Sequence, residues 1–154
     1  MLKRVLKIIL IVLAIAFVAA QFVRPDLSSK PVNPAESIAT ADDVPAEVKA
    51  IFARSCSDCH SFETHLPWYA EVAPFSWMLA DHIADGRGEL NLSLWNTYEP
   101  RRKNKKAAEV CEQVQAREMP LPSYLWMHRD AVLSDDDIRT LCAWSDSVQG
   151  IKTP

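Results

Sequence analysis

Glycine is scarce in this sequence, which argues against a fold rich in β-sheet. The 154 residues include only three glycines, against ten prolines. Folds rich in β-sheet use glycine at the many tight turns that require a positive φ angle. Apolar residues make up 49% of the chain, a proportion within the ordinary globular range. The composition therefore indicates a globular chain in which a sheet-rich fold is disfavoured.

Acidic residues are absent from the beginning of the chain. All 20 of them follow position 24, together with 13 of the 17 basic residues, so this larger part carries a net negative charge. An acidic domain of this kind repels the phosphates of nucleic acid. We therefore expect no nucleic-acid partner.

The N-terminal stretch combines basic and apolar residues in an ordered way. An apolar run from Ile8 to Val23 follows three basic residues, Lys3, Arg4 and Lys7. The sequence Val18-Ala19-Ala20 would suit the cleavage site of a signal peptide, and the run is slightly shorter than the roughly 20 residues of a membrane span. Between these two interpretations we favour an N-terminal transmembrane helix over residues 1–23. The positive-inside rule then places the rest of the chain outside the cytoplasm.

The most specific motif is Cys56-Ser57-Asp58-Cys59-His60, the signature of covalent haem c attachment. The two thiols bind the vinyl groups of the porphyrin, and His60 provides an imidazole ligand to the iron. A thioredoxin-like site requires a βαβ unit, and no alternating strand pattern flanks the motif. A zinc site requires four ligands in tetrahedral array, which adjacent Cys59 and His60 cannot easily supply. We therefore predict one covalently attached haem c, with its iron, per chain.

The predicted domain organisation places this motif in the second of two segments that follow the N-terminal stretch. Residues 24–44 are rich in proline, serine, asparagine and alanine, and we interpret them as a flexible tether. Residues 45–150 form the predicted haem-binding domain. The expected haem domain faces the periplasm or the extracellular side of the cytoplasmic membrane.

Helical periodicity recurs along the domain. The residues Val48, Ile51, Phe52 and Ser55 predict a short helix that runs directly into Cys56. A second helix is expected over residues 74–86, with Gly86 or Gly88 as its stop signal, and a third begins near Arg101. Ser134 and the acidic residues after it predict the start of a last helix. The fold class is therefore expected to be all-α.

A second ligand to the iron is expected from the segment Glu118-Met119-Pro120-Leu121-Pro122. The thioether of Met119 is a soft ligand that raises the reduction potential of haem when it is paired with histidine. The two prolines end the preceding helix and stiffen the segment. Met127 and His128 are competing candidates, and His128 would lower the potential. Met78 and His82 share one predicted helix face, which more often means a place in the core.

Two cysteines lie outside the attachment motif. Cys111 and Cys142 both fall on predicted buried helix faces. In an oxidising compartment they could form a disulfide, whereas buried free cysteines are also ordinary core residues. The sequence leaves both states open.

Taken together, these motifs resemble the small bacterial haem-binding-domain proteins, which are membrane-anchored relatives of mono-haem cytochromes c. The resemblance covers about residues 44–144 and rests on five segments: Arg54–Ser61, Pro67–Tyr69, Ala73–Trp77, Leu90–Trp95 and Glu118–Tyr124. It implies haem c binding, a mostly helical, cytochrome c-like fold and an exported domain. Arg117 departs from the pattern, because a small residue is expected before the Glu-Met-Pro segment.

The favoured functional hypothesis is one-electron transfer between redox partner proteins at the membrane surface, with His60 and Met119 as axial ligands. The chain would then be a non-catalytic cytochrome. An alternative is a haem-based sensor or a peroxidase-like enzyme with an open or displaceable sixth iron position. No distal histidine and arginine motif typical of peroxidases is evident. A purely structural haem protein is a third hypothesis.

Overall fold

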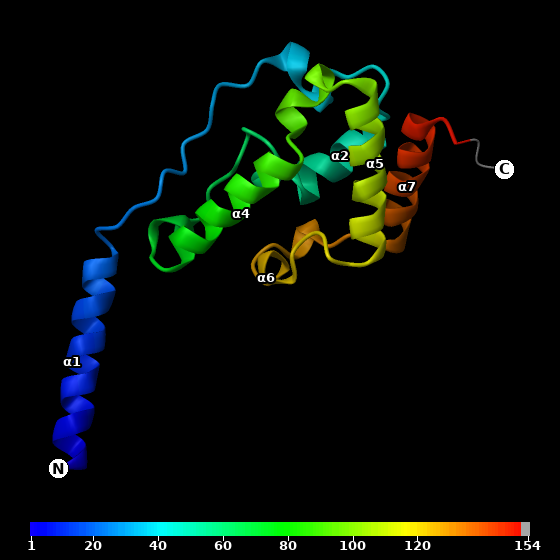
Figure 1. The fold of residues 1–154 in the computed structure, drawn as a ribbon. Helices are drawn as coiled ribbons and strands as arrows, with labels where there is room; N and C mark the ends of the chain where they lie inside the picture. The colour runs from blue at the N-terminus through cyan, green and yellow to red at the C-terminus, as the bar shows by residue number, and fades with distance from the viewer. Residues whose placement is uncertain (152–154) are drawn as a thin grey trace.

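The computed structural model describes residues 1–151, and every regular element in this range is a helix. Because residues 1–151 contain no β-strand, the predicted all-α fold class is confirmed. Figure 1 shows a compact body and one helix that projects from it. The longer helices are α1 (Leu2–Ala20), α2 (Ala46–Ser55), α4 (Phe75–Glu89), α5 (Pro100–Gln115) and α7 (Asp135–Gln149). The shorter ones are η1 (Pro34–Glu36), η2 (Ile38–Thr40), α3 (Ser57–His60), η3 (Trp68–Glu71), η4 (Leu92–Thr97), α6 (Pro122–Leu125) and η5 (Arg129–Ala131).

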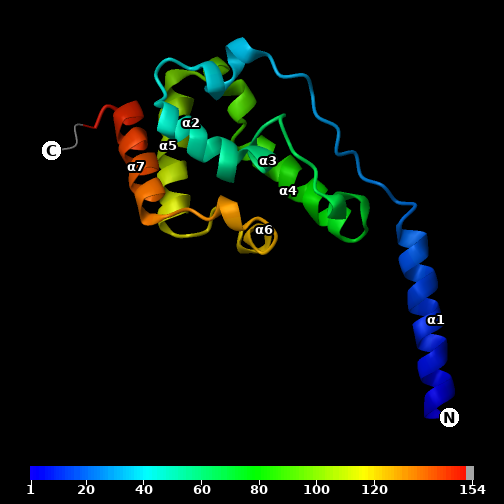
Figure 2. The same cartoon turned by 180° about the vertical axis from the view of Figure 1, so that it is seen from behind.

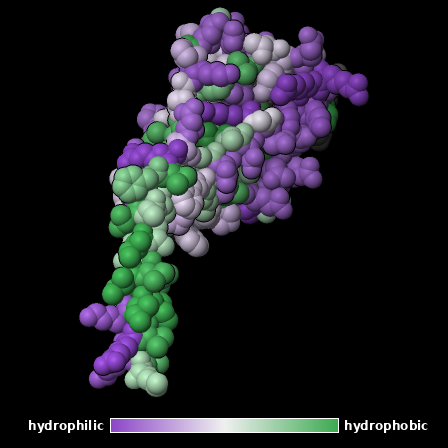
Figure 3. All heavy atoms as spheres, turned by 60° about the vertical axis from the view of Figure 1, so that its left-hand side comes forward, coloured by the Kyte–Doolittle hydropathy of each residue, from purple (hydrophilic) through white to green (hydrophobic). Residues whose placement is uncertain are grey.

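The projecting helix is α1, whose 19 residues contain no buried side chain. Figure 3 shows apolar side chains along most of α1 and hydrophilic ones near its free end. Across residues 1–151, no helix combines the length and the apolar character that a membrane span requires. In α1 the three cations Lys3, Arg4 and Lys7 interrupt the apolar sequence. The transmembrane helix expected over residues 1–23 is therefore not supported.

The segment after α1 is held against the body by hydrogen bonds. The side-chain amide of Gln21 donates to the carbonyl oxygen of Ala73 at 3.2 Å and accepts from the N–H of Ala73 at 3.0 Å. The indole N–H of Trp77 donates to the carbonyl oxygen of Val23 at 2.7 Å. Figures 1 and 2 show the extended chain between these contacts and η1 running along one side of the body.

Part of the predicted tether belongs to the core. Ile38, Ala41 and Val44 are buried in the main apolar cluster. The side-chain amide of Asn96 donates to the carbonyl oxygen of Ser37 at 3.0 Å and fixes this segment against η4. The structured body therefore begins before residue 45, inside the segment whose composition had indicated a tether.

The core is built around α7, which packs against both α5 and α2. The predicted pattern on α2 is correct, because Val48, Ile51 and Phe52 are all buried. The ring of Phe52 packs edge-on against Trp144 of α7, with the ring centroids 5.3 Å apart. Burial of each such side chain contributes about 1.5–3 kcal/mol to folding. This packing makes α2 a fixed support for the motif that follows it.

Helices α5 and α7 are also joined covalently. Cys111 and Cys142, whose state the sequence left open, form a disulfide with their Cα atoms 4.8 Å apart. Helix α7 begins as predicted at Ser134, whose side chain accepts from the N–H of Asp137, while the Asp137 carboxylate accepts from the N–H of Ser134. This reciprocal capping box satisfies two backbone donors at the helix start.

Helix α4 differs from its prediction. It continues through Gly86 and Gly88 to Glu89, so neither glycine acts as a stop signal. The stop signal predicted at these positions is therefore wrong. Gly86 is buried and has a role in packing, which is described below.

Candidate functional site

The motif residues are presented by one helical turn. Helix α2 ends at Ser55, and the chain continues through Cys56 into α3. The N–H groups of Cys59 and His60 both donate to the carbonyl oxygen of Cys56, at 3.3 and 3.0 Å. Side chains three and four positions apart share one face of a helix. Cys56, Cys59 and His60 consequently line the same cavity.

His60 has a defined orientation. Its Nδ1 atom lies 3.0 Å from the carbonyl oxygen of Leu90, which caps the C-terminus of α4. Because a carbonyl oxygen can only accept, Nδ1 carries the proton, and Nε2 presents a lone pair. Burial lowers the pKa of His60, although hydrogen bonds to backbone carbonyls oppose this effect. The neutral, oriented imidazole is the form that binds a metal ion.

Helix α4 packs closely against the backbone of the motif. A Cβ atom placed on Gly86 would lie only 2.7 Å from the carbonyl oxygen of Cys59. Any side chain at this position would therefore push α4 and α3 apart. Gly86 permits the close approach that also brings Leu90 to His60.

The thiols of Cys56 and Cys59 are free and half-buried. Burial raises the pKa of Cys56 to about 12, and the neighbouring Cys59 adds to this effect. Burial also raises the pKa of Cys59 to about 11, with a further contribution from the negative charge of Asp58. Both sulfurs therefore keep their protons at neutral pH.

The cavity itself has a volume of about 640 Å³, which lies in the range of about 300–1,000 Å³ typical of cofactor sites. Its walls come from α3, η3, α4 and the segment after α5. Met119 lines it together with Cys56, Cys59 and His60, so the structure brings the four predicted site residues together. The cavity is also lined by three residues that are predicted from the sequence as alternative ligands or core residues: Met78, His82 and Met127.

We call residues 116–128 the strap, because they close one side of this cavity. The strap begins at a Schellman motif, in which the N–H of Glu118 donates to the carbonyl oxygen of Gln113 at 3.0 Å. Arg117 adopts a φ angle of 59°, a conformation that usually requires glycine. Its guanidinium donates to the carbonyl oxygen of Leu133 at 2.8 Å and pairs with Asp135. These contacts explain how an arginine occupies a position where a small residue is expected.

A second set of polar residues joins the strap to the motif. The hydroxyl of Tyr124 donates to the Oδ2 atom of Asp58 at 2.7 Å. The ring of Tyr124 stacks on His128, whose Nε2 atom is hydrogen-bonded to the hydroxyl of Tyr69 at 2.9 Å. Burial raises the pKa of Tyr124, and the hydrogen bond to Asp58 adds to this effect. Sequence reasoning missed this network, because the two hydrogen bonds join residues 66 and 59 positions apart.

The chemistry of the cavity bears on the three interpretations of the motif, which are haem c attachment, a thioredoxin-like site and a zinc site. No group of three or more histidine, cysteine, aspartate or glutamate side chains within residues 1–151 could hold a metal ion, which argues against zinc. The absence of strands in the same range removes the support for a thioredoxin-like site. Two free thiols, one oriented imidazole and one thioether around an apolar cavity fit the donor set of haem c.

Comparison with known protein families identifies a haem-related family. A family described as a haem-binding domain matches residues 15–147, which include the motif, the strap and both disulfide cysteines. The comparisons with curated proteins and with solved structures found no match.

Proposed function

Because this chain belongs to the haem-binding-domain family, we propose that it is a haem c protein that transfers single electrons. Cys56 and Cys59 would hold the porphyrin through thioether bonds, and His60 would bind the iron through Nε2. Met119 would supply the sixth ligand. One observation carries this proposal: the four side chains line one cavity while Leu90 keeps Nδ1 of His60 engaged.

The residues of the chain account for several requirements of this function. The hydrogen bond from His60 to Leu90 fixes the imidazole, so the ligand does not have to reorient. The walls of the cavity are largely apolar, which suits the apolar face of a porphyrin. Haem iron with a histidine and a thioether ligand exchanges one electron at a raised potential.

We also propose that the domain works with redox partner proteins at the outer face of the cytoplasmic membrane. Two features support this location. The basic residues and apolar run at the N-terminus are typical of exported chains. The disulfide between Cys111 and Cys142 is typical of an oxidising compartment.

The alternative function, a sensor or peroxidase-like enzyme, has one observation in its favour. All residues of the strap lie in the described range, and none of them is buried. A loosely packed strap could release Met119 and open the sixth position to an external ligand. The two functions therefore differ in the occupancy of one coordination position.

The visible spectrum of the oxidised, haem-loaded protein distinguishes them. Electron transfer predicts a sulfur-to-iron charge-transfer band that Met119→Ala abolishes. Met127→Ala is the matched control, because Met127 lines the same cavity from the exposed end of the strap and should leave the band intact. A high-spin wild-type spectrum without this band would contradict His60/Met119 ligation and support the alternative function.

A further inference from the structure

The strap has little apolar packing to hold it against the cavity. None of residues 116–128 is buried, and Trp126 and Met127 are 73% and 58% exposed. The Schellman motif and Arg117 fix only its beginning. The remaining part, which carries Met119 and α6, needs another attachment if the Met119 sulfur is to keep one position.

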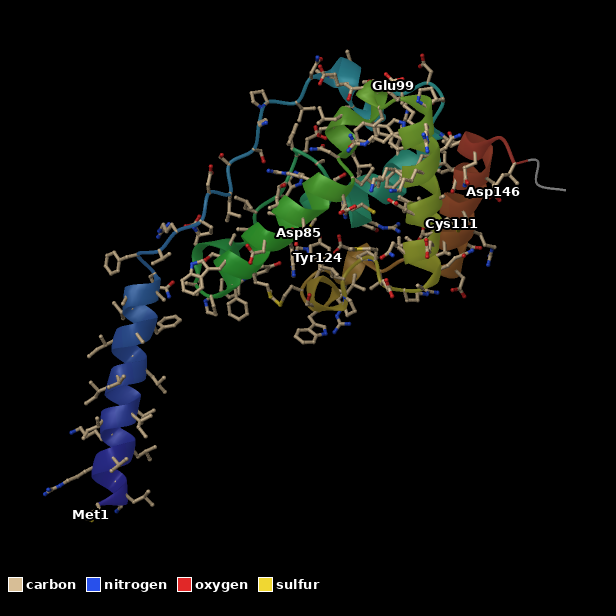
Figure 4. The ribbon with its side chains drawn as sticks, in the orientation of Figure 1. Met1, Asp85, Glu99, Cys111, Tyr124 and Asp146 are labelled. Carbon is tan, nitrogen blue, oxygen red and sulfur yellow. A yellow bond between two sulfur atoms is a disulfide. The ribbon has the colours of Figure 1, made fainter. Side chains whose placement is uncertain are left out.

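The polar network described above supplies such an attachment. Tyr124 and His128 lie one helical turn apart, with ring centroids separated by 4.1 Å and ring planes only 7° apart. From this stacked pair, hydrogen bonds diverge to two elements on the other side of the cavity. Tyr124 bonds Asp58 in α3, and His128 bonds Tyr69 in η3. Figure 4 labels Tyr124 at the side of α6 that is nearer to α4.

The acceptor of the first bond is itself held in place. The second carboxylate oxygen of Asp58, Oδ1, accepts from the N–H of His65 at 3.0 Å. The backbone carbonyl of Asp58 accepts from the hydroxyl of Thr64 at 2.7 Å. Asp58 directly precedes Cys59, so the bond from Tyr124 connects the strap to the attachment motif itself.

We propose that Tyr124 and His128 form a clasp that fixes the strap to the Cys56–His60 motif and thereby positions the Met119 sulfur. The proposal rests on the proposed function, because it concerns the same sixth ligand. Tyr124 and His128 are positioning residues: they act on the iron site through Met119. Loss of either hydrogen bond raises the fraction of molecules in which the strap has moved away.

Cyanide titration of the full-length, oxidised, haem-loaded protein tests this clasp, because cyanide competes with Met119 for the iron. Tyr124→Phe retains the stacked ring and removes the hydrogen bond to Asp58. It should tighten cyanide binding by about tenfold, the effect of losing one charge-assisted hydrogen bond. His128→Phe should act in the same direction. His65→Ala is the control, because His65 also contacts Asp58 but its side chain is 92% exposed and lies outside the strap; it should bind cyanide like the wild type.

The same substitution made in the Met119→Ala variant distinguishes the clasp from a general effect of Tyr124 on the cavity. In Met119→Ala no sulfur competes with cyanide, so adding Tyr124→Phe should leave the affinity unchanged. The clasp is disproved if Tyr124→Phe and His128→Phe both bind cyanide with wild-type affinity, or if the tenfold effect persists without Met119. Failure of the proposed function looks different: the wild type would lack the sulfur-to-iron band, and Met119→Ala alone would not change cyanide affinity.

Discussion

Gly86 of α4 and Cys59 of the attachment motif are in direct backbone contact. A Cβ on Gly86 would lie 2.7 Å from the carbonyl oxygen of Cys59 and 3.1 Å from its carbonyl carbon. Four residues later, Leu90 accepts the hydrogen bond from His60. One close helix contact therefore sets the positions of both a thiol and the imidazole.

This contact predicts that Gly86→Ala is destabilising. The new methyl group meets backbone atoms, which cannot move aside as a flexible side chain can, and overpacking of this kind costs about 1–3 kcal/mol. Gly88→Ala is the matched control, since a Cβ there has no neighbour within 4 Å. It should stabilise the same helix by about 0.5–1 kcal/mol. Urea unfolding of the two variants measures both effects, and equal stabilities would contradict the close contact.

The strap predicts a distinction between two substitutions of Arg117. Alanine and glycine both remove the guanidinium contacts to Leu133 and Asp135. Only glycine adopts the φ angle of 59° without steric cost. Arg117→Gly should therefore be more stable than Arg117→Ala by about 1 kcal/mol in urea unfolding. If the alanine variant is as stable as the glycine variant, the left-handed conformation at this position is wrong.

The capping box of α7 predicts a pH-dependent stability. Burial raises the pKa of Asp137, but hydrogen bonds from Ser134 and Arg54 outweigh it and leave the pKa below its ordinary value of 3.8. Its contribution is therefore present above pH 3.8 and is lost as the pH falls below that value. Asp137→Asn should lower the free energy of unfolding by about 0.5–1.5 kcal/mol at pH 7, the contribution of a typical hydrogen bond.

Urea unfolding at a series of pH values measures the difference in free energy of unfolding between the wild type and Asp137→Asn. This difference should fall toward zero in acid. Asp136→Asn is the control for a charge in the same first turn, because Asp136 lies outside the capping box. Asp136→Asn should lower the free energy of unfolding by a smaller amount, about 0.3–1 kcal/mol. A cost for Asp137→Asn that stays constant down to pH 2 would contradict the role of the carboxylate.

The features that sequence predicted well are local ones. The helix that leads into Cys56 follows from the spacing of Val48, Ile51 and Phe52, and the start of α7 follows from Ser134. Both depend on interactions within a few residues, which the order of residues expresses directly. The turn that carries Cys56, Cys59 and His60 is equally local, because the N–H groups of Cys59 and His60 both donate to the carbonyl oxygen of Cys56.

The features that sequence missed depend on contacts between distant segments. Gly86 resembles a helix stop until the backbone of Cys59 is placed beside it. Ile38, in a segment with the composition of a tether, is buried because η2 packs against η4 in the main apolar cluster. The hydrogen bond between Asp58 and Tyr124 joins residues 66 positions apart, and no periodic pattern reports such a pair.

Acid–acetone extraction of the haem-loaded chain tests the central claim, covalent attachment at Cys56 and Cys59, most directly. The wild type should keep its haem with the precipitated protein, and so should Cys56→Ala or Cys59→Ala alone, because one thioether bond remains. The double variant Cys56→Ala with Cys59→Ala should release haem into the solvent. Release of haem from the wild type, or retention by the double variant, would contradict the account.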